Sequence, residues 1–136
     1  MDFHALSAGV AHLVLINGTS GGTSTNDISN LTIAGLEFMS GAGSFTVSGN
    51  DLTLSDGVTN AGNSSQTLAT NLILGGTTRV FRTVGNLTVS GVISNGSGSP
   101  GLTKNGTGTL TLSGNNTYNG TTTLNAGTVV IGHANG

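Results

Sequence analysis

The chain has 136 residues, a formal net charge of −2, no cysteine, and charged side chains at 6% of its positions. Its three lysine and arginine residues are too few for a surface that follows a phosphate backbone, which excludes nucleic-acid binding. Without cysteine, the chain has neither a disulfide framework nor a thiolate metal site. The 24 glycines and the single proline are typical of a fold with many tight turns.

The start of the chain resembles neither a secretory signal nor a membrane segment. Residues 1–9 lack the positively charged region of a signal, and the apolar run at 10–16 is short and interrupted by His12. No segment approaches the length that crosses a bilayer. We therefore interpret residues 1–12 as an irregular start and 13–16 as a strand that ends at the Asn17-Gly18 turn. For an exported protein, the signal is then expected to be removed or to lie upstream.

One phrase recurs along the chain: an apolar residue, threonine, an apolar residue, serine or alanine, and glycine. It occupies residues 31–35, 45–49, 87–91 and 110–114, with a close variant at 52–57 and a more distant one at 72–76. Alternation with a period of two places the apolar residues on one face of a strand and threonine on the other. Leu31, Leu52 and Leu72, and then Leu110 and Val129, lie about twenty residues apart on either side of a less regular middle. Such a step indicates a solenoid of short strands.

Other fold classes fit the sequence less well. No window keeps apolar residues at helical spacing for three turns, and glycine recurs too often for a helix. A β-sandwich also uses short strands and frequent turns, so it remains an alternative. Four Asn-Gly pairs, which begin at residues 17, 95, 105 and 119, are candidate hairpin turns, but the strands beside them span only about four residues. The pattern therefore favours a coil of many short strands.

The last third of the chain carries the most specific motif. It consists of Leu-Thr-Lys at 102–104, Gly-Thr-Gly-Thr-Leu-Thr-Leu-Ser-Gly-Asn-Asn-Thr-Tyr at 106–118, Gly-Thr-Thr at 120–122 and Asn-Ala-Gly-Thr at 125–128. In order and spacing, these residues resemble the autotransporter-associated β-strand repeat of passenger regions in bacterial surface and secreted proteins. Residues 26–94 resemble, more loosely, the segment that often precedes this repeat. The resemblance implies a right-handed parallel β-helix that acts as a scaffold, and it supplies no catalytic residues.

We predict a single β-solenoid domain or fragment over residues 1–136, an all-β right-handed parallel β-helix of about six coils. It divides into the irregular start at 1–12, front coils at 13–94, an exposed loop at 95–100 and the repeat at 101–132. Coils about 4.8 Å apart would make a rod about 30 Å long, with hydroxyl and amide groups outside. The residues predicted to stack inside are Leu15, Leu31, Ile33, Phe38, Phe45, Val47, Leu52, Leu54, Leu72, Leu74, Leu87, Val89, Leu110, Leu112, Leu124, Val129 and Ile131.

Carboxylates are the first candidates for chemistry, because parallel β-helices often carry carbohydrate-cleaving sites. The acidic residues are Asp2, Asp27, Glu37, Asp51 and Asp56. Glu37 alternates with inward neighbours and is predicted to face solvent. Asp51 and Asp56 flank one strand and could form a Ca²⁺ or acid–base pair, but no cluster of further acids or cations accompanies them. We therefore predict that they initiate or cap turns.

Histidines and glycine-rich turns give no stronger site. His4, His12 and His133 lie at the two ends of the chain, so they would not converge on a metal ion or form a catalytic base with an orienting partner. The Gly106-Thr107-Gly108 turn is followed by another strand instead of the helix that a phosphate site needs. The sequence thus predicts no catalytic, cofactor-binding or metal-binding residue, and no enzyme.

For three other features, we prefer a structural interpretation to a functional one. Lys104 is predicted at the surface, where its charge would discourage edge-to-edge strand pairing. Tyr118 could stack on a ligand, but we predict a partly buried tyrosine in a turn. Several Asn-x-Ser/Thr triplets occur, including those at Asn17, Asn30, Asn86, Asn105 and Asn119; composition accounts for them, and no glycans are predicted.

Outward threonines suggest one sharper hypothesis. Thr107, Thr109 and Thr111 would line the outer face of one strand, and Thr121 and Thr123 that of another. Flat threonine arrays on solenoids can bind ice, but this requires a Thr-x-Thr pair at the same place in every coil. The front half supplies single threonines instead, at Thr32, Thr46, Thr53 and Thr88. Ice binding is therefore disfavoured.

The function predicted is a non-catalytic structural or adhesive segment of an exported bacterial surface protein, located outside the cell or on its surface. Its partners would be neighbouring coils of the same or an identical chain. The alternative is a glycan- or surface-binding module that uses exposed Thr, Asn and Tyr118. A polysaccharide-cleaving enzyme and an ice-binding protein are less favoured. If the 136 residues are a complete chain without caps, we expect head-to-tail stacking into fibres; if they are a fragment, adjacent coils would supply the caps.

Overall fold

The computed structural model describes residues 12–133, and every regular element in that range is a β-strand. All the strand pairs are parallel. This confirms the all-β parallel solenoid that the sequence predicts. The strands are β1 (His12–Ile16), β2 (Gly22–Asn26), β3 (Leu31–Phe38), β4 (Phe45–Gly49), β5 (Leu52–Leu54), β6 (Val58–Asn60), β7 (Gln66–Leu68), β8 (Leu72–Leu74), β9 (Arg79–Thr83), β10 (Leu87–Val89), β11 (Ile93–Asn95), β12 (Leu102–Asn105), β13 (Thr109–Leu112), β14 (Thr122–Leu124) and β15 (Thr128–Ile131).

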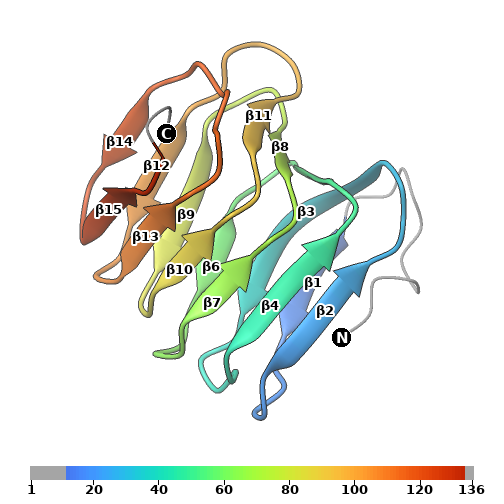
Figure 1. Cartoon of the computed structure of the whole chain (residues 1–136). Helices are drawn as coiled ribbons and strands as arrows, with labels where there is room; N and C mark the ends of the chain where they lie inside the picture. The colour runs from blue at the N-terminus through green and yellow to red at the C-terminus, as the bar shows by residue number, and fades with distance from the viewer. Residues whose placement is uncertain (1–11, 134–136) are drawn as a thin grey trace.

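The chain passes over three faces in a repeating order, and each face is a column of parallel strands (Figure 1). Face 1 holds β1, the second half of β3, β6, β9, β12 and β14. Face 2 holds β2, β4, β7, β10, β13 and β15. Face 3 holds the first half of β3, β5, β8 and β11. Faces 1 and 3 form one nine-stranded sheet because β3 continues through the corner between them, whereas face 2 is a separate six-stranded sheet.

Register steps along face 1 give the number of turns. The partners are Val14 with Leu36, Leu36 with Val58, Val58 with Phe81, Phe81 with Lys104, and Lys104 with Leu124. Each step is one circuit of the chain, and its length lies within the usual range of solenoid repeats. The solenoid therefore makes about five turns, slightly fewer than the six predicted. The first and last strands lie at opposite ends of the stack (Figure 1).

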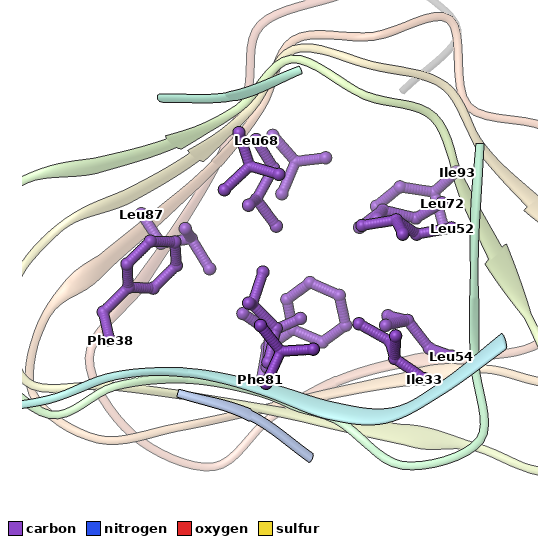
Figure 2. Close-up of a cluster of buried hydrophobic side chains, with 14 of the residues drawn as sticks. Ile33, Phe38, Leu52, Leu54, Leu68, Leu72, Phe81, Leu87 and Ile93 are labelled. Atoms are coloured by element: carbon purple, nitrogen blue, oxygen red, sulfur yellow. The ribbon is translucent and has the colours of Figure 1, made fainter. Parts of the chain in front are cut away.

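The core consists of side-chain stacks along the solenoid. On face 3, Leu52, Leu72 and Ile93 are register partners and lie one behind another in Figure 2. Leu54 and Ile33 form the neighbouring stack in the same way. Of the seventeen residues predicted inside, thirteen are buried: Leu31, Ile33, Phe38, Phe45, Val47, Leu52, Leu54, Leu72, Leu74, Leu87, Val89, Leu110 and Leu112.

The predicted inward position of Leu15 is wrong. Leu13 and Leu15 are 60% and 46% exposed, whereas Val14 and Ile16 are buried. The run at 13–16 is aliphatic at every position, so a period of two cannot fix which residues face inward. The register does so instead, because Val14 and Ile16 pair with the buried residues of β3.

Three predicted core residues of the last coil are not enclosed either. Leu124 and Ile131 are 52% and 48% exposed, and Val129 is only partly buried. Their parity is as predicted, because Leu124 follows the inward column of face 1 and Ile131 pairs with the buried Leu112. They are exposed because no described strand lies beyond β14 and β15 to cover them.

The sequence repeat looks less regular in its middle because positions from two different faces were counted as one series. Leu31, Leu52 and Leu72 lie on face 3, where the next partner is Ile93. Leu110 belongs to face 2, where it pairs with Leu87 and leads to Val129. Within each face the step keeps nearly the same length, so the repeat continues through the middle of the chain.

Polar side chains also lie inside, contrary to the expectation that hydroxyl and amide groups stay outside. Asn26 Nδ2 donates to the carbonyls of Asn50 and Asp51 in the following coil, at 3.0 and 3.3 Å. Gln66 Nε2 donates to the carbonyl of Gly43 in the preceding coil, at 2.9 Å. Buried polar groups of this kind join neighbouring coils. The buried polar residues are Ser24, Asn26, Asn60, Gln66, Thr70, Thr83, Lys104 and Asn116.

An exposed loop of residues 96–99 precedes β12, and Ser94 and Asn95 belong to β11. In the part of the chain that the structure describes, no helix is long and apolar enough to cross a membrane.

Candidate functional site

Within residues 12–133, the carboxylates and histidines singled out in the sequence do not gather at one place. Asp51 and Asp56 are exposed on either side of β5, and Asp51 Oδ1 accepts a hydrogen bond of 3.0 Å from Asn71 Nδ2 of the next coil. Within residues 12–133, no group of three or more histidine, aspartate and glutamate residues could hold a metal ion. His12 begins β1 and His133 follows β15, at opposite ends of the stack. Asp2 and His4 lie outside the described residues.

A shallow hollow on face 1 does bring charged residues together. It has a volume of about 270 Å³, and Glu37, Asp56 and Arg82 are among its lining residues. Gly35 and Gly57 also line it. Glu37 and Arg82 are both register partners of Thr59, so one strand separates them. Sequence reasoning missed this grouping, although aligning the chain by the step of face 1 would have brought these positions together.

A second hollow, of about 330 Å³, lies at a turn and is lined by Ser29, Asn30, Gly49, Asn50 and Asp51. Asn30 adopts a positive φ of 57°, a conformation that asparagine tolerates better than most residues. The hollow contains one carboxylate, that of Asp51, whereas Asp56 lines the hollow on face 1.

The outer surface of face 2 carries a column of threonines. Thr23, Thr46, Thr67, Thr88 and Thr111 are successive register partners, one from each coil. Sequence reasoning identified Thr46, Thr88 and Thr111 but treated the first two as unrelated single residues. It missed Thr23 and Thr67, because the phrase that led to the others is altered around them.

The remaining threonines lie elsewhere. Thr32 and Thr53 pair with each other on face 3, so they do not extend the column of face 2. Thr107 lies in the turn before β13, and Thr109 in β13 faces outward beside Thr111. Thr123 pairs with Thr103 on face 1, and Thr121 precedes β14. The array is therefore one threonine wide along most of its length.

Faces 1 and 2 differ in charge. The strands of face 2 contain no charged residue, whereas those of face 1 include Glu37, Arg79 and Arg82. Thr46, Thr67, Thr88 and Thr111 are half-buried, as expected for short side chains on a flat sheet. Face 2 therefore offers hydroxyl groups at a regular spacing of about 4.8 Å without competing ionic groups.

Tyr118 is partly buried, as predicted, but it lies in an irregular stretch between β13 and β14 and not in a turn. Its ring packs against the core, and its hydroxyl group lies 2.6 Å from Thr122 Oγ1. Both interactions occupy the side chain and make it a poor platform for a stacked ligand.

The prediction that Lys104 lies at the surface is wrong. Its side chain is fully buried in the inward column of face 1, between Phe81 and Leu124. Burial lowers the pKa of the Lys104 amine. The alternation of residues around β12 already indicated an inward position, because Leu102, two residues earlier, is also buried.

Comparison with known proteins agrees with this fold. Residues 102–131 match the family model of the passenger-associated-transport-repeat. A stretch of 75 residues, 52% of this chain, is 39% identical to a protein named adhesin BmaC autotransporter from Brucella suis biovar 1 (strain 1330). The chain spans only 2% of the length of that relative. No solved structure gives a significant match. The resemblance of the C-terminal third to an autotransporter passenger repeat is thereby confirmed.

Proposed function

We propose that the chain is a non-catalytic structural and adhesive segment of an exported bacterial surface protein, because residues 102–131 match an autotransporter passenger repeat. The similarity to a protein named as an adhesin supports an extracellular or cell-surface location. Within residues 12–133, no group of three or more histidine, aspartate and glutamate residues could hold a metal ion, which is consistent with a role without catalysis.

The observation that carries the structural part of this proposal is the continuity of the inward columns. Face 1 and face 2 each contain six strands in one register, and the core continues from coil to coil. Since each coil depends on its neighbours, such a stack acts as one stiff rod. The two ends of the described chain lie at opposite ends of this rod, as a spacer requires (Figure 1).

Stiffness can be tested with a pair of spin labels at Thr23 and Val130. These residues begin and end one outward column of face 2, five register steps apart. A rigid stack predicts a narrow distance distribution, and its centre is the sum of five spacings of about 4.8 Å before allowance for the labels. A broad distribution would contradict the role of a spacer.

The adhesive part is assigned to face 2, because its strands are uncharged and rich in hydroxyl groups. A neutral surface of this kind suits a neutral glycan or another polar uncharged surface better than a charged polymer. The double variant Thr67→Val/Thr88→Val removes two neighbouring hydroxyl groups of the column. Thr32→Val/Thr53→Val is the matched control, since these residues are also half-buried register partners but lie on face 3.

Beads coated with the 136-residue chain should bind to epithelial cells or to a glycan array, and the face 2 variant should lose at least fivefold of this binding. The face 3 variant should bind like the unmodified chain. Equal binding by both variants would remove face 2 from the proposal. Thermal hysteresis measured on the same samples tests the ice-binding alternative, which the single threonine column supports only weakly.

Self-stacking of the isolated chain is the last component of the proposal. Leu124 and Ile131 are exposed beside the unpaired edges of β14 and β15, so they offer a surface on which a further coil can pack. Ile131→Lys should abolish head-to-tail fibres in negative-stain images. Val130→Lys is the control, because Val130 is similarly exposed but lies on the outward face of the same strand. Compact monomers of the unmodified chain at high concentration would contradict self-stacking.

A further inference from the structure

Lys104 is the only lysine, arginine, aspartate or glutamate that is buried within residues 12–133. Its register partners are Phe81 in the preceding coil and Leu124 in the following one. A buried charge normally needs an oppositely charged partner or several hydrogen bonds. For Lys104, the structure supplies hydrogen bonds to backbone carbonyl groups.

The Lys104 ammonium group has three donors, and each donor has an acceptor. Nζ donates to the carbonyl oxygens of Asn105, the last residue of β12, at 2.9 Å and of Gly106, in the turn that follows, at 2.8 Å. It also donates to the carbonyl oxygen of Ala126 at 3.2 Å, in the turn after β14. The lysine therefore joins two successive turns, one in its own coil and one in the next.

Glycines with positive φ shape both turns. Gly106 has a φ of +83° and Gly127 a φ of +76°. A Cβ atom on Gly127 would lie 2.8 Å from Lys104 Nζ and 2.4 Å from the carbonyl oxygens of Gly106 and Gly108. The turn of the last coil thus fits against the lysine only without a side chain at this position.

Arg79 uses the same chemistry elsewhere in the solenoid. Its Nε donates to the carbonyl oxygen of Leu54 at 3.1 Å, and its second terminal nitrogen donates to the carbonyl of Gly75. Leu54 and Gly75 belong to successive coils. Two of the three cations in the chain therefore bridge coils through backbone carbonyl groups.

The last coil is joined to the preceding one by its backbone ladders, by Asn125 Nδ2, which donates to Asn105 Oδ1 at 2.9 Å, and by Lys104. Residues 121–123 are all threonine, so moving β14 by two residues would leave a threonine facing outward opposite Thr103. Leu124 is half-exposed and loses little from such a shift. Register is weakly specified in strands with a uniform polar pattern, and a single buried polar group can then select it.

We propose that Lys104 is the positioning residue that sets the register of the C-terminal coil, by binding the carbonyl groups of two successive turns with its ammonium group. In the shifted register, Ala126 O no longer lies against Nζ, and one donor of the buried ammonium group loses its acceptor. This inference concerns the assembly of the coil and holds whether or not the chain is adhesive.

The register can be measured directly by disulfide trapping, because the chain contains no cysteine. Thr103→Cys/Thr123→Cys joins the residues that pair in the structure, and Thr103→Cys/Thr121→Cys joins those that would pair after a shift of two. With Lys104 present, the first pair should cross-link at least tenfold faster than the second. With Lys104→Met, whose unbranched side chain is one atom shorter and has no donor, the ratio should fall below threefold.

Arg82→Met is the matched control. It removes the same charge from the neighbouring strand β9, but at an exposed position. The tenfold preference should persist in this background. A tenfold preference that also persists with Lys104→Met would overturn the proposal.

Hydrogen exchange of β14 on the same samples keeps the test decisive if the coil detaches. Loss of both cross-links together with rapid exchange of β14 would mean that Lys104 only holds the coil in place. That outcome would also overturn the assignment of register to this residue. Retained protection of β14 with a mixture of both cross-links is the result that supports it.

Discussion

The first and the last coil follow the same inward pattern but differ in burial. In β1, Val14 and Ile16 are each 1% exposed, whereas Leu124 in β14 and Ile131 in β15 are about half exposed. The inward pattern therefore determines where a side chain points, but it does not determine how far the side chain is buried. Stability in this solenoid is expected to be high in the middle and at the first coil, and low at the last coil.

The largest effect is expected in the middle of the stack. Phe81 is fully buried with coils on both sides, so Phe81→Ala should lower the free energy of unfolding by about 3–5 kcal/mol. Chemical denaturation followed by circular dichroism measures this change. A loss below about 1 kcal/mol would mean that the central coils are not packed as described.

A matched isoleucine pair compares the two ends directly. Ile16→Ala should cost about 2–5 kcal/mol because Ile16 is enclosed, and Ile131→Ala should cost less than about 1 kcal/mol because Ile131 is half exposed. The same denaturation experiment gives both values. Equal costs would show that the two ends are equally well packed and would remove the difference between them.

Two asparagines allow the same comparison between the two ends for side-chain hydrogen bonds. Asn26 is buried and donates to two carbonyl groups, so Asn26→Ala should cost about 1–3 kcal/mol. Asn125 in the last coil is exposed, and its side-chain amide donates to Asn105 Oδ1 at 2.9 Å. Asn125→Ala should therefore change the free energy of unfolding by less than about 0.5 kcal/mol. A larger effect at Asn125 than at Asn26 would contradict the comparison.

The smallest effect is expected in the dependence of the free energy of unfolding on pH. Burial lowers the pKa of Lys104 in the folded chain below its ordinary value of 10.5. Between the folded pKa and 10.5, the unfolded chain binds more protons, so the free energy of unfolding should rise with pH in that alkaline window. The register partners of Lys104 are Phe81 and Leu124, which do not titrate. Denaturation from neutral to alkaline pH should show the rise in the unmodified chain and not in Lys104→Met; parallel curves would contradict it.

Much of the fold could be predicted from the sequence because the alternation of apolar residues and threonine fixes side-chain direction. Leu52, Leu54, Leu110 and Leu112 are buried as expected for this reason. The inward position predicted for Leu15 was wrong because an unbroken aliphatic run has no alternation of apolar and polar residues. The burial predicted for Leu124 and Ile131 was wrong because burial depends on a neighbouring coil. The sequence pattern within one coil does not contain this information.

The candidate surfaces were harder to predict because they depend on alignment between coils. Thr23 and Thr67 join the threonine column only once the step within face 2 is known. For Lys104, the alternation of residues in its strand indicated an inward side chain, whereas its charge indicated a surface position. The surface position was predicted, and this prediction is wrong. Three carbonyl groups compensate that charge, and they belong to left-handed turns that the sequence marks only as Asn-Gly and Ala-Gly.

The parallel stacking of the coils can be tested most directly through methyl contacts between β5 and β8. In the structure, Leu52 pairs with Leu72 and Leu54 with Leu74. Nuclear Overhauser spectra of selectively methyl-labelled protein should therefore show stronger contacts within these two pairs than for Leu52 with Leu74 or Leu54 with Leu72. The reverse pattern would indicate antiparallel layers and would contradict the solenoid.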